Sequence, residues 1–300
     1  MTDTAPPIRI ERDGAVAVVV IDNPPLNLFG PSMFAALEHV AAELVALTDP
    51  MHLDRARAVL FEARGKVVSG GVDVGYFRDI AESAEPVRKG ADLWTRLLRV
   101  VRTIEDLPVP TVFAAHGLTL TAAFELALCC DILLAAERAS FALNEVVVGL
   151  TPSMGGPQRL AERAGPARAR ELIYTGERYP AAVLERWNVV NRVLPDEGFP
   201  AAAREYAHRV ATGPTVAHAA TKRLVATAVR DGARAADTLV PEVSGALFGT
   251  SDLRGAVSSF LTEGPGRSPW SRRARGSDRW RRAARRTAPP RRSPRPAGRG

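Results

Sequence analysis

Cysteine is scarce in this chain of 300 residues, since only Cys129 and Cys130 occur and they are adjacent. Neighbouring cysteines inside the apolar helix predicted at this point are poorly placed to bridge each other, and no metal-ligand spacing surrounds them. We therefore expect no disulfide framework, no metal site, and a reducing, cytoplasmic location.

Long apolar runs are also missing. The N-terminal stretch MTDTAPPIRIERDG contains no run of signal-peptide length, and no stretch reaches the roughly 18 uninterrupted apolar residues of a membrane span. We expect no membrane segment. With 46% hydrophobic and 24% charged residues, the composition is that of a globular protein that can bury a core.

Acidic residues are nearly absent from the last part of the chain. Residues 267–300 contain thirteen arginines and one acid, Asp278, so they contribute +12 to a net charge of +7 and leave about −5 for the rest. Their composition, without hydrophobic periodicity, predicts a disordered Arg/Pro-rich tail over residues 265–300. Trp270 and Trp280 among the arginines allow RNA binding, but a solvated tail, or out-of-frame translation of a GC-rich gene end, is the stronger interpretation.

Strand and helix patterns alternate in the first half of the chain. Residues 8–10 and 15–21, either side of Asp13-Gly14, predict a β-hairpin. Apolar runs typical of buried strands follow at residues 56–63, 109–115 and 131–136. Helices are predicted from Pro31 to about residue 47, over residues 85–106, and after residue 121.

Helices dominate after residue 156. Two short helices are closed by Gly165 and Gly176, a third begins at residues 179–181, and WNVVNRVLP predicts a short extended piece. Further helices are predicted over residues 199–212, 214–230, 233–247 and 251–261. The order predicts an α/β fold with a core domain over residues 1–195 and a C-terminal helical subdomain over residues 196–264.

Two carboxylates lie in the most apolar region, residues 110–160. Glu125 lies in the predicted helix after the small residues 121–123, and Glu145 precedes the run Val146-Val147-Val148. A buried carboxylate is costly unless it is paired, hydrogen-bonded or used in chemistry. Glu125 in a helix's first turn and Glu145 as a cap would be a purely structural explanation. Spacing alone leaves both explanations open.

A family resemblance covers the chain from about Val16 to Leu261. The segments VVVIDNPPLNLF, ARAVLFEARGKVVSGGVDVGYF and PTVFAAHGLTLTAAFELALCCDILLAAERASFALNEVVVGLTPSMGGPQRL resemble, in this order, the crotonase superfamily of enoyl-CoA hydratases and isomerases. The resemblance implies a spiral of stacked ββα units with a C-terminal helical trimerisation subdomain. It also implies an acyl-CoA thioester substrate, a homotrimer or hexamer, and no cofactor beyond the coenzyme A of the substrate.

The resemblance assigns roles to particular residues. It implies that the backbone N–H groups of Val72 and Ala122 hold the thioester oxygen, where preorganised donors stabilise a developing oxyanion. Glu125 would then activate water and Glu145 would protonate the α-carbon, as a base and an acid acting on one double bond. Substrate-binding positions carried over in the same way are Leu28, Ser69, Gly70, Gly71 and Asp73, although a structural role for Asp73 is favoured.

Both acids together favour an enoyl-CoA hydratase, which is a carbon–oxygen lyase. The alternatives are a double-bond isomerase, a decarboxylase or a thioester hydrolase on the same oxyanion hole, or a weakly active protein whose basic tail binds nucleic acid. The chain departs from the family pattern at Thr121-Ala122-Ala123, where three glycines are usual, at Val68, where an aromatic is usual, and at Phe124, where a small residue is usual. These departures predict an altered acyl pocket or weakened activity.

Overall fold

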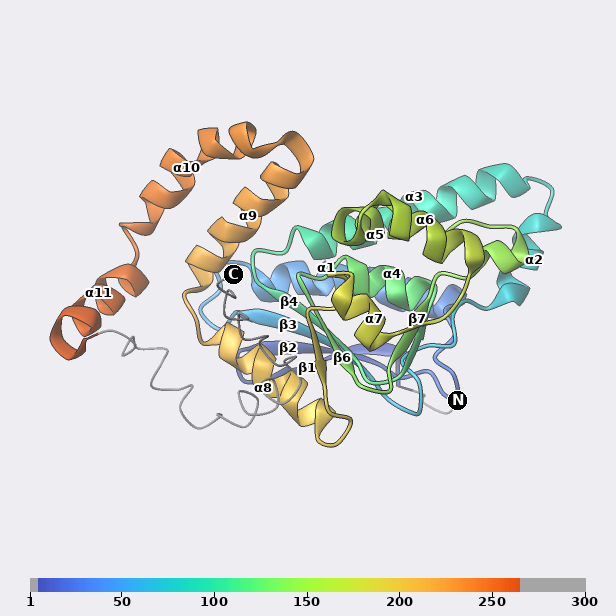
Figure 1. Cartoon of the computed structure of the whole chain (residues 1–300), viewed down its shortest axis with the longest axis horizontal. Coiled ribbons are helices and arrows are strands. Elements are labelled where there is room, and N and C mark those ends of the chain that lie inside the picture. The colour runs from blue at the N-terminus through green and yellow to red at the C-terminus, as the bar shows by residue number, and fades with distance from the viewer. Residues whose placement is uncertain (1–4, 265–300) are drawn as a thin grey trace, which may run out of the picture.

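The computed structural model describes residues 5–264, which are built around a six-stranded sheet (Figure 1). Its strand order is β1-β2-β3-β4-β6-β9. The predicted hairpin is present as β1 (Ile8–Asp13) and β2 (Val16–Ile21), with Gly14 at φ 56° in the turn. The other strands join in parallel: β3 (Ala58–Ala63), β4 (Thr111–Ala115), β6 (Ile132–Ala136) and β9 (Arg192–Leu194).

A smaller three-stranded sheet, which the sequence did not predict, has the order β5-β7-β8. Its strands are β5 (Leu118–Leu120), β7 (Ser140–Ala142) and β8 (Tyr179–Pro180). Two single parallel bridges lie nearby: Phe29 pairs with Val72, and Ser69, in the loop after β3, pairs with Thr119 in β5. Along the chain, β4 joins the large sheet and β5 the small one. After the helix Ala122–Leu128, β6 again joins the large sheet and β7 the small one.

One face of the large sheet carries most of the helices and the main apolar core. This core includes side chains from α1 (Pro31–Thr48), α3 (Pro86–Glu105) and α4 (Ala122–Leu128). Shorter helices complete this side: α2 (Val74–Ala81), which was not predicted, α5 (Gly156–Ala164), α6 (Pro166–Thr175) and α7 (Ala181–Arg186). Gly165 at φ 86° and Gly176 at φ 61° end α5 and α6, as predicted.

The opposite face of the sheet is covered by α8 (Phe199–Ala211) (Figure 1). Its buried side chains pack on the alternate residues of the strands, such as Val18, Leu60 and Leu134, in a second apolar cluster. The predicted boundary at 195/196 therefore differs from the packing, because α8 belongs to the body of the protein. Its apolar residues at positions 199, 203, 207 and 211 form one stripe that requires the sheet as its partner.

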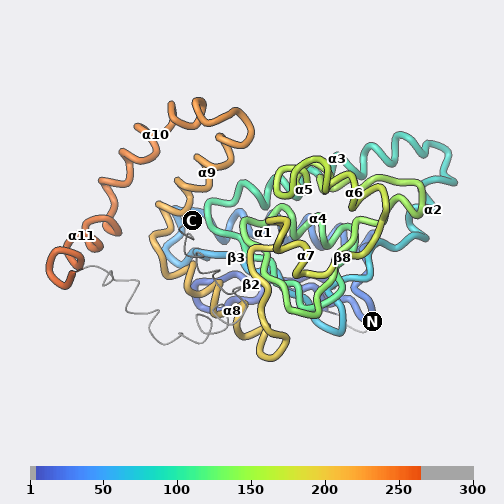
Figure 2. Tube along the Cα trace, in the orientation of Figure 1, coloured from blue at the N-terminus to red at the C-terminus, as the bar shows by residue number. Residues whose placement is uncertain are grey.

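The last helices lead away from the sheet (Figures 1 and 2). They are α9 (Thr215–Asp231), α10 (Ala233–Leu247), which packs against α9, and α11 (Ser251–Glu263). All three were predicted to within about two residues, and they expose large apolar side chains such as Val225, Phe248 and Leu261. Within residues 5–264, every helix is too short or too polar to cross a bilayer. The predicted tail lies outside the described residues.

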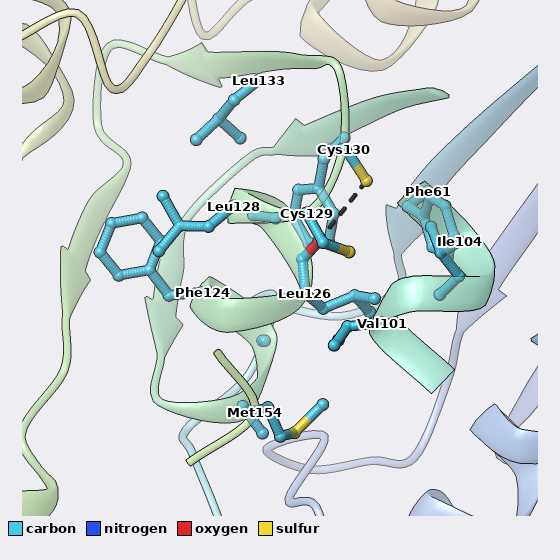
Figure 3. Close-up of a cluster of buried hydrophobic side chains, with 14 of the residues drawn as sticks. Phe61, Val101, Ile104, Phe124, Leu126, Leu128, Cys129, Cys130, Leu133 and Met154 are labelled. Atoms are coloured by element: carbon cyan, nitrogen blue, oxygen red, sulfur yellow. Dashed lines mark hydrogen bonds between the residues drawn. The ribbon is translucent and has the colours of Figure 1, made fainter. Parts of the chain in front are cut away.

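The two cysteines lie at the end of α4 rather than inside it, so this part of the prediction was wrong. The helix ends at Leu128, Cys129 is its C-terminal cap and Cys130 follows. Both thiols are free and buried among apolar side chains (Figure 3), and each donates to the Leu126 carbonyl, at 3.0 and 3.5 Å. The sharp turn into β6 follows immediately, which explains why an apolar sequence stops being helical here.

Candidate active site

The loop after β3 is held in place by Asn27. Its side-chain N–H2 donates to the carbonyls of Arg64, Val67 and Val68 at 2.9, 3.2 and 3.1 Å. Its side-chain oxygen accepts from the Asn23 N–H at 2.6 Å. Asn27 is buried and has φ 51°, a left-handed conformation that asparagine adopts more readily than most residues. One amide side chain therefore fixes the path of the loop.

The loop then presents the N–H of Val72. Ser69 Oγ donates to the Asn27 carbonyl at 2.7 Å and accepts from the Gly71 N–H at 3.0 Å. Gly71 has φ 109°, which favours glycine. Its carbonyl accepts from the Phe29 N–H at 2.8 Å. Because a trans peptide directs its C=O and N–H in opposite directions, the Val72 N–H points away from Phe29.

The second predicted donor, Ala122, is the first residue of α4. The Thr121 carbonyl accepts from the Glu125 N–H at 2.9 Å, so it points along the helix. The Ala122 N–H of the same peptide therefore points out of the helix start. Thr121 also contacts the first loop, because a Cβ on Gly71 would lie 3.0 Å from Thr121 Oγ1. The two predicted donor segments, fifty residues apart in sequence, are thus packed together.

Glu125 is held by the start of α5. Only 2% of its surface is exposed, and its Oε2 accepts from the Gly156 N–H at 2.6 Å. Backbone N–H groups of Ser153 and Met154 also interact with the carboxylate. A Cβ on Gly156 would lie 2.9 Å from both Cγ and Oε2 of Glu125, so the close approach requires glycine. The sequence analysis missed Gly156, for which the pair Gly155-Gly156 before Pro157 was the only indication.

Glu145 reaches the same place from a 3-10 helix, Glu145–Val148, that follows β7. It is 7% exposed, and within the described residues its Oε2 is buried without a hydrogen-bond partner. The three valines after it are exposed, so they do not continue the core as their apolar character suggests. If Glu145 were only a structural cap, both carboxylate oxygens should have hydrogen-bond partners. The unpartnered Oε2 therefore argues against the structural explanation for Glu145.

Both carboxyl groups bind protons more tightly than an ordinary glutamate. Burial, and then repulsion from Glu145, raise the pKa of Glu125 to about 8, although its backbone hydrogen bonds oppose this shift. Burial also raises the pKa of Glu145 to about 7. Because the two groups interact, these steps belong to the pair. Near neutral pH the pair therefore holds one proton and one negative charge. These pKa values favour the proton on Glu125, so the form with Glu125 charged and Glu145 protonated, which the expected roles require, is the less populated of the two.

Four predicted residues line one cavity: Val72, Ala122, Glu125 and Glu145. Its volume is about 10 Å³, close to the size of a single water molecule. The remaining walls come from α1, α2, α3 and the segment before α5, and they are Phe34, Phe77, Trp94, Leu150, Thr151, Ser153 and Met154. A larger surface hollow of about 380 Å³ between α2 and α3 contains none of the predicted site residues.

The other predicted binding residues lie beside this cavity. Ser69 is buried and its hydroxyl is used within the loop. Leu28 packs against Gly70, whose Cβ would lie 3.3 Å from Leu28 Cδ2. Asp73 caps α2, since its Oδ1 accepts from the Gly75 N–H at 2.9 Å, as the structural alternative predicted. Substrate contact by Leu28, Ser69, Gly70, Gly71 and Asp73 stays a prediction.

Phe124 and Val68, two of the residues that depart from the family pattern, do not line the cavity. Phe124 is fully buried and packs against Phe141, with ring centroids 5.0 Å apart. Val68 is also fully buried. The sequence analysis missed Phe77 and Trp94, whose rings meet edge to face at 5.7 Å. Within residues 5–264, no group of three or more His, Cys, Asp or Glu side chains could hold a metal ion.

Comparison with known proteins places this geometry in context. The chain matches the family model described as enoyl-CoA hydratase/isomerase over residues 11–266. It is 28% identical to the short-chain-enoyl-CoA hydratase of Clostridium acetobutylicum over 255 residues, 85% of this chain and 94% of that one. It is 31% identical to the carnitinyl-CoA dehydratase of Salmonella enteritidis over 219 residues, 72% and 79% of the two chains. An enoyl-CoA hydratase structure from Mycobacterium smegmatis superimposes with a TM-score of 0.77 at 26% identity, covering 89% and 99%.

Proposed function

The chain belongs to the enoyl-CoA hydratase/isomerase family and has the crotonase fold, and from this premise we propose that it adds water reversibly to a trans-2-enoyl-CoA thioester. One observation carries the proposal: two buried glutamates and two outward-pointing amides line the same cavity. A double-bond isomerase needs one group that moves a proton, whereas hydration needs a base for water and an acid for the α-carbon. The names of two relatives, a hydratase and a dehydratase, also support the addition or removal of water.

In the proposed reaction, Glu125 takes a proton from water while the water oxygen bonds to the β-carbon. The electron pair of the double bond moves toward the thioester oxygen, and the amides of Val72 and Ala122 stabilise the enolate that forms. Glu145 then gives its proton to the α-carbon. One water has been added, and a proton moved from Glu125 to Glu145 restores the starting state. We propose that no metal or redox cofactor takes part.

The test is the loss of the absorbance of the conjugated thioester on short, long and branched enoyl-CoA substrates, with product mass measured in parallel. Hydration adds the mass of one water, whereas isomerisation adds nothing. Glu125→Gln and Glu145→Gln keep the side-chain shape and should each lower kcat by at least about 10²-fold, the usual contribution of a general acid or base. The proposal fails if the wild type hydrates none of the substrates, or if both variants keep wild-type rates.

We also propose that α9, α10 and α11 mediate assembly into a homotrimer or a hexamer of two trimers. Exposed apolar residues on these helices, such as Val229, Phe248 and Phe260, support this. Light scattering coupled to size exclusion would measure the mass in solution. A monomer at micromolar concentration would contradict the assembly without affecting the proposed reaction.

A further inference from the structure

Thr121 combines two features that are unusual for a threonine. Its backbone has φ 48° and ψ −120°, a conformation that glycine adopts readily and a β-branched residue only under strain. Its residue surface is 8% exposed, and its Oγ1 is buried without a hydrogen-bond partner in the described part of the chain. A strained backbone and an unsatisfied hydroxyl each cost stability, so their coincidence at one residue calls for a functional explanation.

The hydroxyl lies at the junction of the two segments that carry the proposed oxyanion donors. Thr121 precedes Ala122, and a Cβ built on Gly71, which precedes Val72, would lie 3.0 Å from its Oγ1. The neighbouring strand gives a useful comparison, because Thr119 Oγ1 donates to the Gly117 carbonyl at 3.0 Å and is satisfied. Within the described residues, no protein group accepts the Thr121 hydroxyl proton, and Thr121 lies next to both proposed donor segments although it is not one of the residues that line the cavity.

We propose that the Thr121 hydroxyl donates a third hydrogen bond to the thioester oxygen, beside the N–H groups of Val72 and Ala122. Thr121 Oγ1 has no hydrogen-bond partner within the described residues, and the thioester oxygen would be its acceptor. The hydrogen bond strengthens when this oxygen gains negative charge in the enolate. This donor offsets the narrower approach that a Cβ at position 121 imposes. The inference rests on the proposed function only in requiring that a thioester occupies this site.

The experiment uses a saturated acyl-CoA with a ¹³C-labelled thioester carbonyl, which cannot be hydrated. Infrared difference spectra of the bound ligand measure the carbonyl stretch, whose frequency falls with each hydrogen bond to the oxygen. Thr121→Ser should keep the wild-type frequency. Thr121→Val keeps the shape and loses the donor, so the frequency should rise. Thr119→Val is the matched control, and the frequency should stay unchanged.

Thr121→Gly separates the donor from the strain. Glycine accepts φ 48°, so this variant should unfold at the same or a higher temperature than wild type, yet it should show the same raised frequency as Thr121→Val. On an enoyl-CoA substrate, kcat should fall about 10²-fold in both variants, as for the loss of one oxyanion donor, with little change in KM.

The outcomes distinguish this inference from the proposed function. A raised frequency in Thr121→Val and Thr121→Gly supports the third donor even if the wild type hydrates no enoyl-CoA, which would defeat the proposed function alone. An unchanged frequency in both variants overturns the third donor even if hydration is fast. Failure of the acyl-CoA to bind the wild-type protein overturns both.

Discussion

Glu125 Oε2 accepts a 2.6 Å hydrogen bond from the backbone N–H of Gly156, the first residue of α5. This bond joins two helices whose sequences are separated by β6, β7 and the segment that carries Glu145. The amides at the start of a helix favour a negative charge, while burial and Glu145 disfavour it. Gly156 therefore fixes the position of the proposed base, and its hydrogen bond partly opposes the rise in the Glu125 pKa that burial and Glu145 cause.

Gly156→Ala should inactivate the enzyme while leaving it folded. The new Cβ would lie 2.9 Å from Cγ and Oε2 of Glu125, so the carboxylate must move away from the cavity. We expect kcat to fall at least about 10²-fold, because misplacement by about 1 Å has this effect. Gly90→Ala in α3, where a Cβ meets nothing within 4 Å, is the control and should keep full activity. Equal activity of the two variants would show that Gly156 does not position Glu125.

The proposed rate should depend on pH as a bell with its maximum between about 7 and 8, the pKa values of the two titration steps of the Glu125–Glu145 pair. Below this range both acids are protonated and the base is lost, and above it both are charged and the acid is lost. Measurement of kcat from pH 5.5 to 9.5 tests this. A rate that is constant between pH 6 and 9 would contradict a shared proton.

The same pKa values predict how stability changes with pH. Each carboxyl has a higher pKa folded than unfolded, so the folded state binds more protons between about pH 4.5 and 8. The contribution of the pair is fully present below the unfolded pKa, and it is lost as pH rises through 7 and 8. The melting temperature of the double variant Glu125→Gln, Glu145→Gln should therefore fall less than that of the wild type as the pH rises through 7 and 8. An identical pH dependence in the variant and the wild type would show that the acids titrate normally.

The sequence predicted this site better than its surroundings. Glu125 and Glu145 were singled out because acids among apolar residues are costly, and Val72 and Ala122 through the resemblance to the crotonase superfamily. All four line one cavity, and their roles stay predictions. Phe77 and Trp94, which line the cavity, and Gly156, which hydrogen-bonds Glu125, were missed, since each comes close only when α2, α3 or α5 packs on other elements. Phe124 does not line the cavity, although it is adjacent to Glu125 in sequence, and the predicted effect of Thr121-Ala122-Ala123, Val68 and Phe124 on the acyl pocket or the activity stays a prediction.

Among the strands and helices too, local patterns were predicted and features that depend on tertiary packing were missed. The long amphipathic helices and buried strands were predicted to within a few residues, because their periodicity is local. Strands β5 and β7 have three residues each, too few to show a pattern, and they depend on pairing with each other. Helix α8 was predicted correctly, but its narrow stripe of Phe and Ala did not indicate that the large sheet is the surface it covers.

Asn27→Gly should lower both stability and activity. Glycine tolerates φ 51°, so this variant removes the side-chain bonds to the carbonyls of Arg64, Val67 and Val68, and the bond from the Asn23 N–H, without straining the backbone. We expect a loss of about 2 kcal/mol in the free energy of unfolding, since buried carbonyls lose their donor. Faster amide exchange over residues 64–72 should accompany a lower kcat. Asn188→Gly is matched in conformation, with φ 63° at an exposed position, and should change neither property.

Arg204→Leu should weaken the attachment of α8 without changing the active site. Arg204 donates from α8 to both oxygens of the buried Glu62 on β3, at 2.7 and 3.1 Å, and its loss leaves that carboxylate with Arg64 alone. We expect the free energy of unfolding to fall by about 2 kcal/mol in urea, while kcat stays within about twofold. Arg230→Leu, which removes an exposed pair with Asp231, should leave stability unchanged. Wild-type stability of Arg204→Leu would show that the apolar stripe alone holds α8 to the sheet, whereas a fall in kcat as large as that of Gly156→Ala would show that α8 positions the active site.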